Sequence, residues 1–267
     1  MRHHFMSWFT GSVLAFAAAA QPAAAQPAPN PVTGAIGDLG HIATSPSRMD
    51  SSDAYRLAAI IGAGALFYSL DGNIRSEVLR NHTSALNHLS DKIQNLGNGG
   101  VDIAITGAGW LAGKAFSDDK LSRTSLLAAE SFLAANGVGS VAKIVIGRSR
   151  PYTGDGKGTF HPFTLKSSRM SFPSGHTTSA FSVASVYAYC YSDSPAVVFS
   201  AYSLAGLVAL QRVYANKHWT SDVFFGSVLG TAVGRMVAAK GMEKPGATAL
   251  LPVIGPGYSG MEAKFSF

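Results

Sequence analysis

Three short stretches of the sequence combine cationic or imidazole side chains with signals for helix ends. The first contains Lys143 and Arg150, seven residues apart, with Pro151 directly after the arginine. Residues seven apart can project from one face of a helix, and a proline favours a helix end just before it. Two cations on an otherwise apolar face favour an anion between them, although the pair taken alone is also typical of solvated surface charges.

The second stretch runs from Pro173 through Ser174 and Gly175 to His176, directly before a Ser/Ala-rich helical segment. A helix start attracts phosphate through its free backbone N–H groups and the positive end of its dipole. Gly175 permits a close approach of the backbone, the Ser174 hydroxyl adds a donor, and His176 can supply a proton near neutral pH. A plainly capped helix start is the alternative interpretation.

The third stretch contains Arg212, His218 and Asp222. One helical turn separates His218 from Asp222, so the carboxylate can accept from one imidazole nitrogen and leave the other facing a substrate. An activated, nucleophilic histidine needs this arrangement, and Arg212 adds a planar fork that matches phosphate oxygens. Such a pair alone is often a surface hydrogen bond, but the three stretches together predict one anion-binding, nucleophilic site.

Small and apolar residues dominate after residue 50, and their spacing predicts helices with almost no strands. The predicted helices cover residues 53–70, 75–96, 101–116, 121–147, 175–192, 195–213 and 219–240. Alternation near the end of the chain suggests a short strand or hairpin. We therefore predict an all-α helical bundle with a short irregular or β-like C-terminal tail.

The chain begins with features of an exported protein. Residues 1–25 combine an early basic residue, an apolar run and a cluster of small residues, which is typical of a signal peptide, with an uncleaved anchoring helix as the alternative. Residues 26–50 are rich in Pro, Ala and Gly and are predicted as a flexible segment. One domain over residues 51–240 and a tail over residues 241–267 complete the expected organisation. We expect a periplasmic location, with membrane association left open.

Charged residues interrupt most of the apolar runs and so favour a soluble domain. A membrane span needs about 20 residues with few charges. Asp71, Lys114 and Arg235 each end an apolar run, and only residues 194–211 approach spanning length without a charge. A soluble or peripherally attached domain is therefore favoured.

The single Cys190 excludes an intramolecular disulfide. The net charge of +6 suits anionic substrates or anionic membrane surfaces, and no aromatic-interleaved basic stripe predicts nucleic-acid binding.

In this order, the three stretches resemble the signature of the type 2 phosphatidic acid phosphatase superfamily, which also contains class A bacterial acid phosphatases and vanadium haloperoxidases. The first motif of that signature, Lys, six residues, Arg-Pro, matches at Lys143 and Arg150. The second, Pro-Ser-Gly-His, matches without change at residues 173–176.

The third motif, Ser-Arg, five residues, His, three residues, Asp, matches at Arg212, His218 and Asp222, but Gln211 stands in place of the serine. Because glutamine can still donate a hydrogen bond, we expect a tuned pocket and a preserved chemistry.

The resemblance implies an all-α bundle of the acid phosphatase/haloperoxidase type in which His218 attacks phosphorus and forms a phosphohistidine. Asp222 would orient His218, and His176 would protonate the leaving alcohol. Five residues would hold the phosphoryl oxygens: Lys143, Arg150, Ser174, Gly175 and Arg212. No set of acids or histidines with metal-ligand spacing occurs in the motif region, so neither a metal nor another cofactor is expected.

The sequence thus predicts a metal-independent phosphatase acting on phosphate monoesters or diphosphates. The expected partners are a phosphorylated lipid or a small phosphomonoester substrate, with peripheral membrane contact and without nucleic acid. A vanadium-dependent haloperoxidase and a non-catalytic protein that binds anionic lipid on the same fold are the alternatives. The loop over residues 152–171 is expected to border the pocket and to help choose the substrate.

Overall fold

The computed structural model describes residues 31–44, 51–94, 99–242, 249–255 and 258–264. The predicted signal peptide lies outside these residues. The helices are α1 Pro31–Thr44, α2 Ser51–Arg80, α3 Ser84–Ile93, α4 Gly99–Ala115, α5 Asp119–Ile146, α6 Gly175–Cys190, α7 Pro195–Tyr214 and α8 Thr220–Met242. Two 3-10 turns, Pro151–Thr153 and Ser167–Arg169, lie between α5 and α6, and strands β1 Ala249–Gly255 and β2 Tyr258–Lys264 pair in an antiparallel hairpin. The predicted all-α fold class is confirmed.

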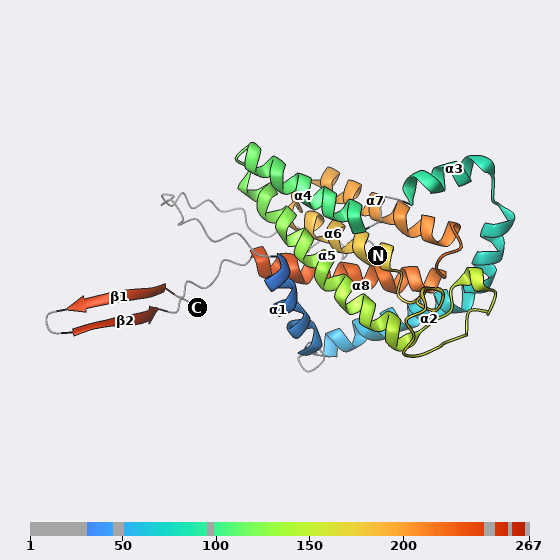
Figure 1. Ribbon diagram of the computed structural model, residues 1–267, viewed down its shortest axis with the longest axis horizontal. Coiled ribbons are helices and arrows are strands. Elements are labelled where there is room, and N and C mark those ends of the chain that lie inside the picture. The colour runs from blue at the N-terminus through green and yellow to red at the C-terminus, as the bar shows by residue number, and fades with distance from the viewer. Residues whose placement is uncertain (1–30, 45–50, 95–98, 243–248, 256–257, 265–267) are drawn as a thin grey trace, which may run out of the picture.

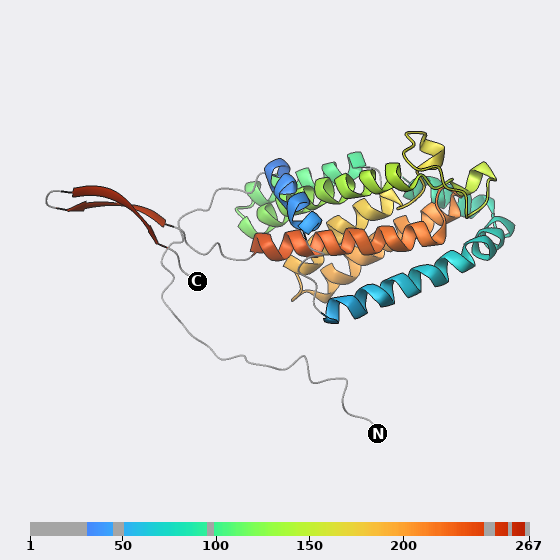
Figure 2. The ribbon, with the colours of Figure 1, turned by 90° about the horizontal axis from the view of Figure 1, so that it is seen from below.

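Helix α6 lies in the middle of the bundle, in contact with α4, α5, α7 and α8 (Figure 1). Helix α2 runs along the bundle beside α8, as Figure 2 shows. Helix α1 packs on α5, and α3 packs on α7. Every other long helix of the bundle is thus positioned against α6 or against a direct neighbour of α6.

Glycines bring α8 unusually close to α6. Side chains of a helix four residues apart share a face, and Gly226, Gly230 and Gly234 form such a row on α8. A Cβ atom at Gly230 would lie 2.4 Å from the carbonyl oxygen of Thr178, and one at Gly234 would lie 2.5 Å from that of Ser182. Small residues at this spacing let two helix backbones touch.

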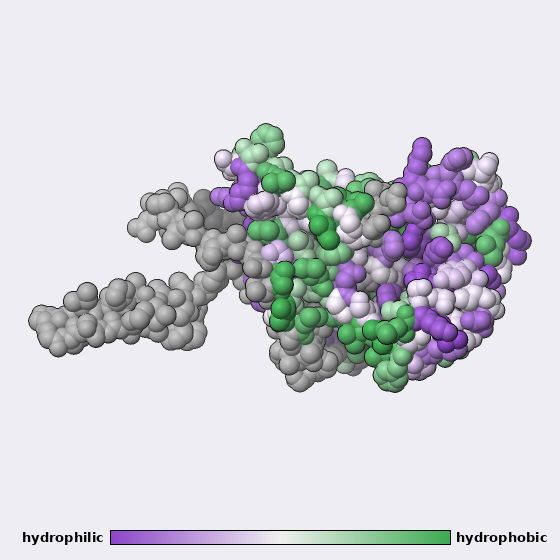
Figure 3. Space-filling model, in the orientation of Figure 1, coloured by the Kyte–Doolittle hydropathy of each residue, from purple (hydrophilic) through white to green (hydrophobic). Residues whose placement is uncertain are grey.

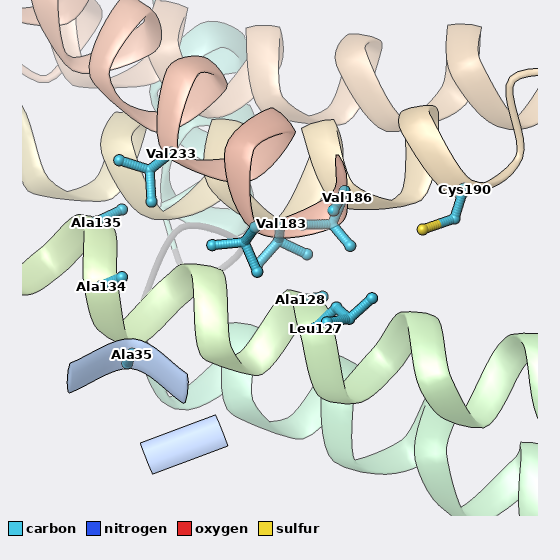
Figure 4. Packing of buried hydrophobic residues seen from close by; sticks show 11 residues of the cluster. Ala35, Leu127, Ala128, Ala134, Ala135, Val183, Val186, Cys190 and Val233 are labelled. Atoms are coloured by element: carbon cyan, nitrogen blue, oxygen red, sulfur yellow. The ribbon is translucent and has the colours of Figure 1, made fainter. Parts of the chain in front are cut away.

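The main apolar core lies where α5, α6 and α8 meet (Figure 4). Leu127 of α5, Val183 and Val186 of α6 and Val233 of α8 form its centre, and they are joined by Ala35 of α1. Burial of such side chains is the main favourable contribution to the folding of the bundle.

Helix α1 differs from the prediction of a flexible segment over residues 26–50. Its Ala35 is buried in the core, and the buried carboxylate of Asp38 accepts a hydrogen bond from Lys240 Nζ at 2.6 Å. These tertiary contacts stabilise a helix that its glycines would disfavour in isolation. The domain boundary proposed at residue 51 stays a prediction.

Helix α2 also differs from its prediction, because it continues unbroken through Asp71 to Arg80. The sequence predicted a break there, since a charge ends the apolar run. Asp71 is instead buried and forms an ion pair with Arg148, with Oδ2 and Nη2 2.8 Å apart. A paired carboxylate can remain inside a helical bundle.

In the part of the chain that the structure describes, four helices, α2, α5, α7 and α8, are long and apolar enough to cross a membrane. The preference for a soluble domain was therefore wrong, and the structure indicates a membrane protein. The preference failed for α2 because Asp71, which was taken to end an apolar run, is buried inside the bundle. Figure 3 shows hydrophobic residues over much of the middle of the bundle and hydrophilic residues at the end that carries α3 and the loop between α5 and α6.

Candidate active site

The three stretches predicted from the sequence meet at this hydrophilic end of the bundle. Lys143, near the end of α5, donates a hydrogen bond from Nζ to the carbonyl oxygen of Pro173. The backbone N–H of Ser174 donates in turn to the carbonyl oxygen of Asp222 at 3.0 Å. The first stretch is thereby joined to the second, and the second to the third.

Helix α5 ends at Ile146 and does not continue to Arg150, although the interpretation of the first stretch required it to. Gly147 takes a left-handed conformation with φ of 61°, and a Cβ atom there would lie 1.8 Å from the carbonyl oxygen of His161. The close approach requires glycine, which ends the helix at Ile146. The prediction that Lys143 and Arg150 project from one helix face was therefore wrong, because Arg150 lies in the loop that follows.

His218 is buried and has a defined tautomer. Its Nδ1 atom lies 2.8 Å from the carbonyl oxygen of Ser171, which can only accept a hydrogen bond. Nδ1 therefore carries the proton, and Nε2 keeps a free lone pair. Burial, with the added repulsion of Lys143 and Arg150, lowers the pKa of His218 to about 3, so the ring is neutral near pH 7.

Asp222 orients His218 less directly than the sequence predicted. Its Oδ2 atom lies 3.9 Å from Nδ1 of His218, beyond hydrogen-bond distance. Ser171 connects the two residues instead, since its hydroxyl donates to Oδ2 of Asp222 at 2.5 Å while its carbonyl accepts from His218. The carboxylate also accepts from the backbone N–H of Trp219 at 2.9 Å, which fixes it in the first turn of α8.

Arg148 and Asp71 complete this network, and neither was predicted from the sequence to be part of the site. Buried Arg148 donates from Nη1 to Oδ1 of Asp222 at 2.6 Å and from Nη2 to Oδ2 of Asp71 at 2.8 Å. Asp71 also accepts from the backbone N–H and the hydroxyl of Ser221, at 2.9 Å and 2.6 Å. A lone acid inside an apolar run was the available signal, because such a residue needs a buried partner.

His176 lies among the three cations of the site. Burial, followed by the charges of Arg212, Arg150 and Lys143, lowers its pKa to about 4. The expectation that His176 supplies a proton near neutral pH thus holds only when an anion opposes those charges. A phosphate group next to the cations would raise the pKa of the imidazole.

Arg212 has a donor that faces no acceptor of the protein. Its Nε atom donates to Oε1 of Gln211 at 2.5 Å, whereas its Nη2 atom is buried and has no hydrogen-bond partner among the described residues. Gln211 donates from Nε2 to the hydroxyl of Ser90 in α3 at 3.0 Å. The glutamine therefore positions Arg212 and anchors α3, and its amide does not donate into the pocket as we expected.

The start of α6 lies where the sequence predicted it, at Gly175. Its first N–H groups have no acceptor within the helix. A Cβ atom at Gly175 would lie 3.4 Å from Cε of Lys143, so the glycine leaves room for the lysine beside the helix start. Ser174 precedes the helix, and its Oγ accepts from the hydroxyl of Thr177 at 2.9 Å, which leaves the Ser174 proton available to a ligand.

The loop between α5 and α6 borders the site, as expected. Arg150 donates from Nε to the carbonyl oxygen of Ser167 at 2.8 Å, and Lys157 donates from Nζ to the carbonyl oxygen of Ser69 in α2 at 2.8 Å. Phe163 and Leu165 lie in the same loop and are each 79% exposed. Within the described residues, no group of three or more His, Cys, Asp or Glu side chains is placed to hold a metal ion.

Comparison with known proteins agrees with these motifs. The PAP2 superfamily model matches residues 124–243, which contain all three stretches. A lipid A 1-phosphatase from Porphyromonas gingivalis is 28% identical over 178 residues, covering 66% of this chain and 36% of that protein. The matched part thus spans about a third of the length of this curated relative.

Two solved structures are similar to the bundle. The transmembrane PAP2 type phosphatidylglycerolphosphate phosphatase from Bacillus subtilis has a TM-score of 0.53 and 24% identity, and the match covers 70% of this chain and 96% of that one. LpxE from Aquifex aeolicus has a TM-score of 0.48 and 20% identity, over 64% of this chain and 95% of that one. The first of these supports the same arrangement of helices.

Proposed function

Because the PAP2 superfamily model matches residues 124–243, which contain all three motifs, we propose that this chain belongs to that superfamily and is a membrane-bound phosphatase that hydrolyses the phosphate monoesters or diphosphates of lipids without a metal ion. Two proteins similar to it are named as phosphatases of lipid A and of phosphatidylglycerolphosphate, which supports a lipid phosphate as the substrate.

One observation carries the proposal: His218 offers an unprotonated Nε2 atom in a site that contains three cations. The Ser171 carbonyl holds the proton on Nδ1 at 2.8 Å and would stabilise the positive charge that the ring gains when Nε2 bonds to phosphorus. The carboxylate of Asp222, 3.9 Å from Nδ1, would add to this stabilisation.

The reaction would proceed in two steps. Nε2 of His218 bonds to phosphorus while the bond from phosphorus to the leaving oxygen breaks, and His176 donates its proton to that oxygen. A water molecule then attacks phosphorus, His176 takes its proton, and the bond to Nε2 breaks to release inorganic phosphate. His176 regains its starting state and His218 its free lone pair.

Charge compensation would come from the protein itself. Lys143, Arg150 and Arg212 surround the site, and the unpartnered Nη2 atom of Arg212 is suited to an equatorial phosphoryl oxygen. The N–H groups at the start of α6 would bind a second oxygen. Positioning and charge stabilisation of this kind contribute most of the catalysis in phosphoryl transfer.

We further propose that the site lies at the periplasmic surface of the membrane. Four helices are long enough to span, and exposed Phe163 and Leu165 beside the site suit the interface between lipid and water. A cysteine introduced at Leu165 should react with a membrane-impermeant maleimide in intact cells, whereas the parent chain, whose Cys190 is buried, should not. Labelling only after cell lysis would contradict a periplasmic site.

The function is tested by phosphate release from phosphatidic acid and p-nitrophenyl phosphate with EDTA present. We expect His218→Ala to lower kcat by about a thousandfold or more, since it removes the nucleophile. His88→Ala, on the exposed surface of α3, is the matched control and should keep full activity. Equal release by the His218→Ala protein would exclude the histidine mechanism, and loss in EDTA with recovery in Mg²⁺ would exclude metal independence.

A further inference from the structure

A cavity of about 440 Å³ opens between α4, α6 and α7, outside the site described above. Small apolar side chains form most of its wall: Ala180, Val183 and Ala184 of α6 and Ala201, Ala205 and Val208 of α7. An apolar cavity of this size is suited to a hydrocarbon ligand.

The cavity begins one helical turn from two residues of the candidate active site. Ala180 follows His176 by four residues on α6, and Val208 precedes Arg212 by four residues on α7. Four residues correspond to about 6 Å along a helix. From there the cavity continues along α6 to Tyr187, away from the hydrophilic end and into the apolar part of the bundle.

Three of the residues that line the cavity carry a polar side-chain group, Tyr187, Ser200 and Asp102, and Asp102 is the one acid among them. Asp102 of α4 is 3% exposed, and its Oδ2 atom has no hydrogen-bond partner among the described residues. A buried oxygen without a partner is unfavourable, and a ligand that carries an O–H or N–H group would relieve it. Asp102 therefore indicates a chain with a hydrogen-bond donor, since a plain alkane would leave the oxygen unpaired.

We propose that the cavity binds a hydrocarbon chain of the lipid substrate, and that Asp102 accepts a hydrogen bond from a hydroxyl or amide group on that chain. This inference rests on the proposed function, because a phosphate held by Arg212 and the start of α6 places the attached chain at the cavity entrance. A chain so bound would select lipids by length and by substitution.

Substitutions that fill the cavity with a larger side chain test whether it binds the hydrocarbon chain of the substrate. Ala201→Phe and Val197→Phe both add bulk to its α7 wall, and Ala58→Phe adds the same bulk to the exposed surface of α2 as a matched control. We expect the two α7 variants to lower kcat/KM for dodecyl phosphate in detergent micelles by about tenfold or more, the scale on which apolar pockets discriminate. Turnover of p-nitrophenyl phosphate should stay within about twofold of the parent, which also shows that the site is folded.

Several outcomes would overturn the inference. One is an unchanged ratio of dodecyl phosphate turnover to p-nitrophenyl phosphate turnover in both α7 variants. Another is an equal loss of dodecyl phosphate turnover in Ala58→Phe. A third is a change of oligomeric state of the α7 variants in detergent, which would mark the cavity as an interface between two copies. If the parent protein hydrolyses neither substrate, the proposed function fails, and binding alone is then decisive. Dodecyl phosphate should raise the Tm of the parent more than that of Ala201→Phe, and an equal rise would reject the cavity as the binding site.

The role of Asp102 has its own readout. Dodecyl phosphates with a hydroxyl at successive carbons are compared with the unsubstituted chain. We expect the parent to prefer at least one hydroxylated isomer, Asp102→Leu to abolish that preference, and Asp102→Asn, whose amide oxygen still accepts, to keep part of it. A parent without preference at any position, or an Asp102→Leu protein that retains it, would contradict the assignment.

Discussion

The two sides of α6 are packed in opposite ways. On the side of α8, Gly226, Gly230 and Gly234 bring the helix backbones into contact, whereas on the side of α4 and α7 small side chains leave a cavity of about 440 Å³. The contact between α6 and α8, here called the tight side, ends at His176 and Asp222. The chemistry depends on the relative position of these two residues. The side that faces α4 and α7, here called the open side, begins at Ala180, one helical turn after His176. Rigid packing thus surrounds the reacting groups, and space is left where a substrate chain can bind.

Removing Arg148 should break the tight side with the largest effect. Arg148→Leu leaves Asp71 and Asp222 buried without their shared cation, so we expect a loss of about 3–5 kcal/mol in the free energy of unfolding. Denaturant unfolding in detergent measures it. Arg80→Leu, which removes an exposed ion pair with Glu77, should cost less than about 1 kcal/mol.

Neutralising one of the stranded acids provides the second check. Asp71→Asn in the Arg148→Leu background should recover part of the lost stability, since only one unpaired carboxylate remains. If Arg148→Leu is as stable as Arg80→Leu, the network does not hold the start of α8 in place.

Gly230→Leu should be the next most disruptive change. The added side chain collides with the backbone of Thr178, and overpacking of this kind costs about 3 kcal/mol. Activity on every substrate should fall together, because α6 and α8 are displaced at the site. Gly206→Leu on α7, where no atom lies within 4 Å of an added Cβ, is the matched control. Equal stability of the two variants would mean that the helices do not need to touch.

The pH dependence should be set by the tight side alone. kcat/KM reports the free enzyme, in which the pKa of His176 is lowered to about 4, whereas kcat reports the complex, in which phosphate raises that pKa. The decline of kcat on the alkaline side should therefore lie at higher pH than the decline of kcat/KM. His176→Asn should remove both declines. A different pH profile for dodecyl phosphate and ethyl phosphate, which share a primary alkoxide as the leaving group, would contradict the separation of the two sides.

The smallest effect is expected from Gln211→Ser, which restores the usual residue of the motif. The change removes the hydrogen bonds to Arg212 and to Ser90, so we expect KM for a lipid phosphate to rise about three- to tenfold with little change in kcat. Ser90→Ala, which loses only the bond to α3, should give a smaller rise. An equally large fall in kcat would show that Gln211 acts on the transition state.

The residues proposed to perform the chemistry could be selected from the sequence because few types of side chain are capable of it. Lys143, Arg150, Arg212, His176 and His218 were found from their types and spacing, and the structure brings their stretches together. The positioning groups were harder to predict. The carbonyl of Ser171 holds His218 at 2.8 Å, and a backbone oxygen leaves no trace in residue type.

The fold class was predictable from helical periodicity, whereas the surroundings of the bundle were not. Asp71 looked like the end of a helix because its partner, Arg148, is 77 residues away in sequence. Helix α1 was missed for the same reason, because Asp38 is paired with Lys240, 202 residues away in sequence. The spanning length of α2 was missed because the sequence alone does not show that Asp71 faces the interior of the bundle.

The contact between His218 and the Ser171 carbonyl also determines which chemical isomer would be trapped. Since the proton stays on Nδ1, the phosphoramidate would form on the ring nitrogen farther from the backbone, giving the tele isomer alone. Rapid alkaline quenching followed by ³¹P NMR would assign the isomer from its chemical shift. The isomer of the phosphohistidine would therefore report whether the Ser171 carbonyl holds the proton on Nδ1 of His218.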